Sequence, residues 1–209
     1  MILPRNGKVV IFDDKYEDVQ ALLGALSKDS VPYHYYQDEG GEDLPTQPIK
    51  NVRLVFLDLE LITGQSLPVK NIIGAIAGRL FAVIEPGTKY VLIYWSTKED
   101  RYREVLDDAF VNGLSDYKPI LTLSLNKVEA LKQSDTLNFI SQGIREKADD
   151  FKLFEIFTLW ENLVNESAGY LINDFTDFIK SDENWDDGAK YVLYKLGTVL
   201  KNKFFNLFL

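Results

Sequence analysis

Short apolar runs that each end on a polar side chain recur along this chain, and they constrain its fold more than any other feature. They are Lys8 to Asp14 (KVVIFDD), Val52 to Leu57 (VRLVFL), Lys89 to Trp95 (KYVLIYW) and Pro119 to Leu125 (PILTLSL). Their length and composition are typical of buried strands. The intervals between them are long enough for helices, so the pattern predicts alternating strands and helices around a parallel sheet.

The intervals themselves carry helical spacing. Apolar side chains recur at helical positions in four segments, which we predict as helices: about Tyr16 to Ser27, Pro68 to Ile84, Asp100 to Val111 and Val128 to Lys147. A further strand is predicted at VPYHYYQ, and the acidic, glycine-rich stretch DEGGEDLPTQPIK after it is predicted as a loop. In the helix that begins near Pro68 we expect the small residues to permit a close approach to the sheet or to another helix; they are Gly74, Ala75, Ala77 and Gly78.

Beyond Ala148 the strand pattern stops and long helical segments rich in aromatic residues replace it. One begins near Phe151 and another spans about Trp185 to Leu209. We therefore predict a domain over residues 1–147 and a helical extension over residues 148–209. The apolar ending FFNLFL leads us to expect that the extension connects to an output region beyond Leu209, or forms a dimer interface. The alternative is that the last helix packs back on the first domain and ends there.

Charge and composition exclude several classes of function. Asp and Glu number 32 and Lys and Arg 23, so the net charge is −9 with the single histidine neutral, and direct binding to nucleic acid is not expected. The absence of cysteine excludes disulfides and thiolate metal sites. With no long apolar stretch and no signal-like start, we expect a cytoplasmic protein that does not enter a membrane.

Acidic side chains follow two of the predicted strands directly. Asp13 and Asp14 end the first run, and Asp58 follows the second. Because the carboxyl ends of neighbouring parallel strands lie side by side, at the edge where open α/β folds bind ligands, we expect these carboxylates to meet. They repel one another unless a cation lies among them, and hard oxygen ligands suit Mg²⁺. The alternative is that they are ordinary turn and helix-capping residues.

The polar residues at the strand ends continue with Ser96 and Thr97 after the third run and with Asn126 and Lys127 after the fourth. An acid pair, a lone acid, a hydroxyl and a lysine in this order resemble the receiver domain of two-component response regulators. The resemblance covers about residues 7 to 147. It implies an α/β fold, a flavodoxin-like (βα)₅ doubly wound parallel sheet of the receiver type, here followed by an α-helical C-terminal extension.

The resemblance also implies the metal and acceptor residues. By position Asp58 matches the aspartate that accepts a phosphoryl group. Asp13 and Asp14 match the acid pair that holds Mg²⁺ together with Asp58, and Glu60 matches the residue whose backbone carbonyl completes the metal shell.

The remaining matches concern the response to phosphorylation. Ser96 matches the switch hydroxyl, with Thr97 as a rival one residue later, and Lys127 matches the invariant lysine. Two positions depart from the pattern. Val128 follows the lysine where proline is usual, and Ser124 stands on the last strand where an aromatic residue is usual. The relay between an aromatic residue and the switch hydroxyl is therefore open here, with Tyr94 and Trp95 on the neighbouring strand as the alternative aromatic residues.

These expectations define a phosphorylation-controlled signalling receiver. Its donor would be a histidine kinase or a phosphotransfer protein, and its own chemistry would extend at most to self-phosphotransfer and autodephosphorylation. The C-terminal helices would transmit the signal or form a homodimer. The rival from another class is a pseudo-receiver, a protein-interaction module that keeps the fold without turning over phosphate. An Mg²⁺-dependent phosphoryl-transfer enzyme ranks last, because no general acid is visible near Asp58.

Overall fold

The computed structural model describes residues 3–5, 7–37, 43–59, 69–96, 103–133, 135–146 and 151–178, together with residues 187, 188, 190, 191 and 194. The chain forms two compact units, Met1–Asn162 and Leu163–Leu209. The domain boundary that the sequence suggests after residue 147 remains a prediction. Most of the helix predicted from about Trp185 to Leu209 lies outside the described residues.

The first unit is built on a five-stranded parallel sheet. Its strands are β1 (Lys8–Asp13), β2 (Tyr33–Gln37), β3 (Val52–Leu57), β4 (Val91–Ser96) and β5 (Leu121–Asn126). They lie in the order β2-β1-β3-β4-β5, and every neighbouring pair is parallel. This is the flavodoxin-like order of a doubly wound sheet, so the predicted fold class is confirmed.

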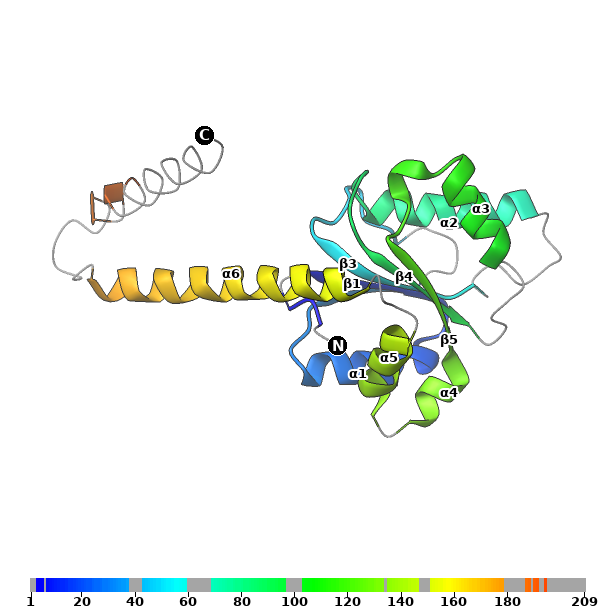
Figure 1. The fold of residues 1–209 in the computed structure, drawn as a ribbon, viewed down its shortest axis with the longest axis horizontal. Helices are drawn as coiled ribbons and strands as arrows, with labels where there is room; N and C mark the ends of the chain where they lie inside the picture. Colours follow the sequence, from blue (N-terminus) through cyan, green and yellow to red (C-terminus); the bar gives the residue numbers. More distant parts are fainter. Residues whose placement is uncertain are drawn as a thin grey trace. The chain divides into compact units, whose positions relative to one another are not determined.

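Helices cover both faces of this sheet (Figure 1). On one face lie α1 (Tyr16–Lys28), α4 (Lys127–Lys132) and α5 (Thr136–Glu146), and on the other α2 (Val69–Val83) and α3 (Arg103–Asn112). Each face has its own apolar core, because successive strand residues point to opposite sides. In β1, Val9 and Ile11 pack against α1, whereas Val10 and Phe12 pack against α2. Asp13, next in this alternation, returns to the α1 face.

The segment predicted as one helix from Val128 to Lys147 is two helices, so that prediction is wrong. The chain is extended at Gln133 (φ −75°, ψ 139°), between α4 and α5. Both helices begin with a side-chain cap. The Asn126 side chain accepts a hydrogen bond from the backbone N–H of Glu129 at 3.1 Å, and the Asp135 carboxylate accepts one from the N–H of Asn138 at 2.9 Å. These local bonds favour two short helices over one long one.

Two further expectations concern the chain between β2 and β4. The described part of the predicted loop, residues 43–50, contains no helix, as expected. The stop after α2 is a turn in which Gly87 adopts a φ of 79°, a conformation that glycine tolerates best. The role expected for Gly74 and Gly78 is wrong, because both are exposed and a Cβ added at either would meet nothing within 4 Å.

A long helix, α6 (Phe151–Phe178), follows the sheet domain. Its residues up to Asn162 belong to the first unit and contact the sheet domain through Phe154, which packs against the apolar core, and through polar groups. The Asn162 side chain donates to the carbonyl of Leu3 and accepts from the N–H of Arg5, both at 3.0 Å. Thr158 and Asn162 are buried, whereas Trp160 is 64% exposed. None of the helices in the described part of the chain combines the length and the apolar character that a membrane crossing requires.

Candidate functional site

The sheet brings Asp13 and Asp58 together at the carboxyl ends of its two central strands. β1 and β3 are neighbours, and Phe12 pairs with Leu57, so the next residues along each strand lie side by side. The backbone N–H of Asp58 donates to the carbonyl of Phe12 at 3.0 Å and extends this pairing beyond the strand end. Both carboxylates are buried on the α1 face, with side-chain exposures of 0% for Asp13 and 2% for Asp58.

Asp14 completes a group of acids whose carboxylate oxygens approach closely. One oxygen from each of Asp13, Asp14 and Asp58 lies within 4.8 Å of the others. The turn into α1 is fixed by hydrogen bonds to its backbone. Asp13 Oδ1 accepts from the N–H of Lys15 at 3.0 Å, and the Asp13 carbonyl accepts from the hydroxyl of Tyr35 at 3.2 Å. We call Asp13, Asp14 and Asp58 the acidic cluster.

Lys127 reaches the acidic cluster from the carboxyl end of β5. It is the first residue of α4, directly after β5, and its side chain is only 3% exposed. Its Nζ lies 2.7 Å from Asp13 Oδ2 and 2.8 Å from Asp58 Oδ2. A third carboxylate, Asp18 Oδ2 on α1, lies at 3.2 Å. One ammonium group therefore faces two buried carboxylates and one that is partly exposed.

The charges in this site shift one another's protonation equilibria. Burial raises the pKa of Asp13 to about 6, although the contacts with Lys127 and with the N–H of Lys15 act in the opposite direction. Burial alone would lower the pKa of Lys127, but hydrogen bonds and Coulomb attraction from Asp13 and Asp58 outweigh it and raise that pKa above its usual value. Lys127 is therefore a fixed positive charge at any physiological pH.

The acidic cluster fits a hard divalent cation by the chemistry of its donor set. All its side-chain donors are carboxylate oxygens, the ligands that Mg²⁺ prefers. Asp13 Oδ2 is buried, and its contact among the described residues is the Lys127 ammonium at 2.7 Å, which leaves one of its two lone pairs unused. This buried oxygen retains an open acceptor position that a cation can fill.

The structure brings together four of the residues predicted from the sequence: Asp13, Asp14, Asp58 and Lys127. Ser96 is the last residue of β4 and pairs with Asn126, but its side chain lies outside the described part of the structure, as do Glu60 and Thr97. Their predicted roles remain predictions.

Asp18 is a partner of Lys127 that the sequence analysis did not identify. The only available signal was its spacing, because Asp18 lies four residues after Asp14 and so comes one helical turn after the acid pair. That spacing does not reveal a contact with a lysine 109 residues away.

Aromatic residues on β4 pack beside the site. Tyr94 pairs with Ser124, and Tyr94 is fully buried, so an aromatic side chain on the neighbouring strand lies beside the small residue on β5. Leu57 pairs with Tyr94, which places Trp95 in the next row, beside Asp58. Trp95 is fully buried and meets the ring of Phe56 edge-on, with 5.7 Å between centroids. Its fluorescence can therefore report changes at the acidic cluster.

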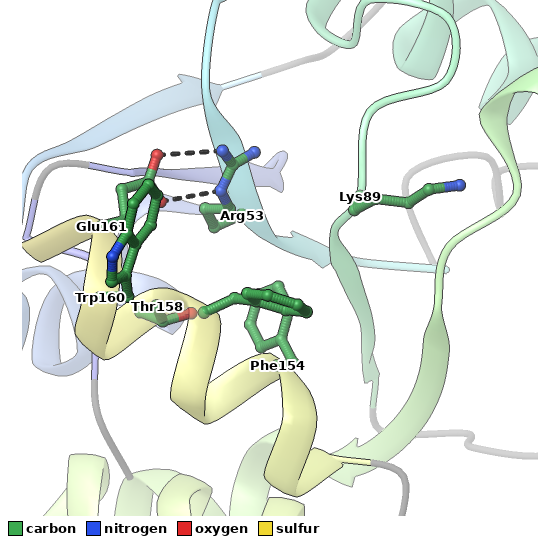
Figure 2. A pocket seen from close by; sticks show the side chains of 7 residues that line it. Arg53, Lys89, Phe154, Thr158, Trp160 and Glu161 are labelled. Atoms are coloured by element: carbon green, nitrogen blue, oxygen red, sulfur yellow. Dashed lines mark hydrogen bonds and ion pairs between the residues drawn. The ribbon is translucent and has the colours of Figure 1, made fainter. Parts of the chain in front are cut away.

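A hollow of about 360 Å³ lies near the amino ends of β3 and β4, away from the acidic cluster. Figure 2 shows the Arg53 guanidinium facing the Glu161 carboxylate, joined by hydrogen bonds of 3.0 and 2.9 Å. This bidentate pair connects β3 to α6, and the buried Thr158 hydroxyl beside it has no hydrogen-bond partner among the described residues. The hollow is lined by Arg53, Lys89, Phe154, Phe157, Thr158, Trp160 and Glu161.

The sequence matches no protein-family model and no curated protein. Among solved structures, it resembles an adenylate cyclase from Rhodopirellula baltica, with 16% identity, a TM-score of 0.36, and coverage of 77% of this chain and 98% of that one. It also resembles the signal receiver domain of a putative LuxO repressor protein from Vibrio parahaemolyticus, with 13% identity, a TM-score of 0.35, and coverage of 76% and 96%.

A fusion that contains a trimeric coiled-coil segment of yeast Spc42 matches with 12% identity, a TM-score of 0.35, and coverage of 86% of this chain and 100% of that one. Identities and TM-scores this low assign no function to the chain. The fold class rests on the order and direction of its strands.

Proposed function

We propose that this chain is a phosphorylation-controlled signalling receiver in which Asp58 accepts a phosphoryl group. The observation that supports the proposal most is the placement of Asp58 beside Asp13, Asp14 and Lys127 at the carboxyl edge of the parallel sheet. A lone acid that is buried, paired with an ammonium and next to further acids matches the chemistry of an acyl-phosphate site.

In the proposed reaction, a carboxylate oxygen of Asp58 attacks the phosphorus of a phosphohistidine on a histidine kinase or a phosphotransfer protein. The new bond is O–P, the P–N bond breaks, and its electron pair leaves with the imidazole nitrogen. Asp13 and Asp14 would hold Mg²⁺ together with Asp58, and the cation would supply positive charge to the phosphoryl oxygens and help to orient the group for in-line attack. Lys127 keeps its ammonium within reach of Asp58 and can donate to a phosphoryl oxygen after transfer.

We propose that Ser96 reads the phosphorylated state by bonding to another phosphoryl oxygen, with Thr97 as the rival. Such movement would change the face formed by β4, β5 and the helices that follow them. Comparing Ser96→Ala with Thr97→Val separates the two candidates. Both variants should still form the Asp58 adduct, but only the variant that lacks the true switch hydroxyl should lose the backbone shifts that accompany it.

The decisive experiment is adduct formation with beryllofluoride, which mimics a phosphoryl group on a carboxylate, followed by fluorine NMR. We expect bound fluoride signals in the unchanged chain only when Mg²⁺ is present, and none with Asp58→Asn. The matched control is Asp116→Asn, which removes an exposed carboxylate from the 3₁₀ turn Ser115–Tyr117. Absence of an adduct in the unchanged chain at saturating reagent would contradict the proposal.

That negative result would instead favour the pseudo-receiver. One observation supports this second candidate: the Lys127 ammonium lies 2.7 Å from Asp13 and 2.8 Å from Asp58, so the chain itself supplies a counter-charge to both buried carboxylates. A pseudo-receiver would keep this ion-paired state permanently and would act by protein binding alone.

We further propose that α6 mediates a homodimer. In the part of α6 that belongs to the second unit, large apolar side chains are exposed in two short rows, each with an interval of seven residues. Their exposures are 52% for Leu163 and 70% for Tyr170 in one row, and 45% for Val164 and 46% for Leu171 in the other. Contiguous apolar surface of this kind marks an interaction site.

A further inference from the structure

The ammonium of Lys127 has a partner outside the acidic cluster. Asp18, in the first turn of α1, places its Oδ2 atom 3.2 Å from Lys127 Nζ. Its side chain is 38% exposed, whereas those of Asp13 and Asp58 are buried. An ammonium group has three N–H donors, and here it faces three carboxylates.

The proposed function gives the three carboxylates that face Lys127 different roles. Asp13 and Asp58 would turn their oxygens to Mg²⁺, and Asp58 would also carry the phosphoryl group. Both contacts of Lys127 with these residues are then weakened, because a cation and an ammonium repel each other when they share a carboxylate. Asp18 belongs to neither task and stays available to the ammonium.

We propose that Asp18 is a positioning residue that holds the Lys127 ammonium at the edge of the acidic cluster while Asp13 and Asp58 bind a divalent cation. This inference rests on the proposed function and adds to it a counter-charge on α1. The geometry that carries it is the single Asp18–Lys127 contact, which bridges the helix after β1 and the helix after β5.

The sign of the effect follows from the charges. Without the Asp18 carboxylate, Lys127 depends on Asp13 and Asp58 alone and competes more strongly with a cation for their oxygens. The site also loses one negative charge that attracts cations. Both effects lower Mg²⁺ affinity, and because Asp18 is partly exposed we expect a reduction of roughly two- to fivefold for Asp18→Asn.

A purely structural role for Asp18 in α1 can be distinguished from the proposed positioning of the Lys127 ammonium. An acid in the first turn of a helix also interacts favourably with the helix dipole. Glu17 lies in the same turn, is exposed and has no contact with Lys127. Glu17→Gln therefore removes an equal charge and an equal dipole interaction without touching the ammonium, and Asp18→Glu restores a carboxylate at the position itself.

The test combines two measurements on the full chain. The first is the ¹⁵N resonance of the Lys127 ammonium without Mg²⁺, assigned by its loss in Lys127→Arg. The second is an Mg²⁺ titration followed by Trp95 fluorescence in a background with Trp160→Phe and Trp185→Phe. We expect Asp18→Asn to move the resonance and weaken Mg²⁺ binding, Asp18→Glu to recover most of both, and Glu17→Gln to leave the resonance in place.

The outcomes distinguish this inference from the proposed function. If the unchanged chain binds Mg²⁺ and Asp18→Asn alters neither its affinity nor the Lys127 resonance, the inference is wrong and the receiver function stands. The same holds if Glu17→Gln weakens Mg²⁺ binding as much as Asp18→Asn does. If the unchanged chain does not respond to Mg²⁺ at all, the proposed function fails and the inference fails with it.

Discussion

At the scale of single residues, the balance of charge around Lys127 decides how this site behaves. Two buried carboxylates share one ammonium, so the site keeps an excess of negative charge after pairing. The buried acids could be predicted from the sequence, because strand ends in a parallel sheet gather at one edge. The contact with Asp18 could not, since it depends on how α1 is rotated against α4, and no periodicity in either segment encodes that rotation.

The raised pKa of Asp13 predicts an unusual dependence of stability on pH. An unfolded chain releases the Asp13 proton near pH 3.8, whereas the folded chain keeps it until about pH 6. Between these values the folded state binds more protons, so in the absence of divalent cations this residue makes the free energy of unfolding fall as pH rises. Asp13→Asn should flatten the profile between pH 4 and 6.

Urea unfolding at half-unit pH steps measures this slope. Glu104→Gln, which neutralises an exposed acid in α3, is the control and should leave the difference between pH 4 and 6 in place. A parallel profile for Asp13→Asn and the unchanged chain would show that Asp13 titrates normally.

At the scale of elements, the strands and the first three helices were predictable to within about three residues, whereas the helix predicted after β5 was wrong. Apolar runs bounded by turn residues locate strands well, and β3 begins and ends where the pattern places it. The break between α4 and α5 was missed because apolar spacing continues across it and neither glycine nor proline marks it. Only Asp135, a capping residue, signals the second start.

Glycines in α1 and α5 give a contrasting pair of predictions. A Cβ added at Gly24 meets nothing within 4 Å, so Gly24→Ala should stabilise the protein by about 0.5–1 kcal/mol through reduced backbone entropy in the unfolded chain. A Cβ added at Gly143 lies 2.8 Å from Leu125 Cδ2 in the core. Overpacking there costs about 1–3 kcal/mol and should cancel or exceed the same gain.

Chemical unfolding of both variants gives the comparison, with helix content followed by circular dichroism. Equal stabilisation by Gly24→Ala and Gly143→Ala would mean that α5 can shift on β5 without cost.

At the scale of the whole molecule, α6 is the element whose role the sequence indicated least clearly. In its first turns Phe154 packs against the apolar core, Thr158 is buried, and Glu161 and Asn162 make hydrogen bonds to the sheet domain. Phe157 and Trp160 are exposed. A polar contact face cannot be read from hydrophobic periodicity, because it is made by specific hydrogen bonds with Arg53 and with the chain near Leu3.

The proposed homodimer can be tested with two single variants, each of which adds one negative charge at a different position of α6. Leu163→Glu places a carboxylate within the apolar rows, where burial of an ionised group is costly, and should weaken self-association by at least about tenfold. Asn165→Glu adds the same charge to an exposed position on the opposite side of α6 from these rows and should change association little. Light scattering over a concentration series gives both values. A monomeric unchanged chain at every concentration would contradict the proposal.

Under the proposed function, a lineage that carries this fold can lose phosphate chemistry without losing the fold. The ammonium of Lys127 holds Asp13 and Asp58 together from within the chain, so selection for partner binding alone is enough to preserve this edge of the sheet. Replacing Lys127 has the opposite result. It leaves two buried carboxylates without a counter-charge, which strongly destabilises the fold as well as the site. In descendants that no longer signal through phosphate, we expect Asp14 to drift before Lys127 does.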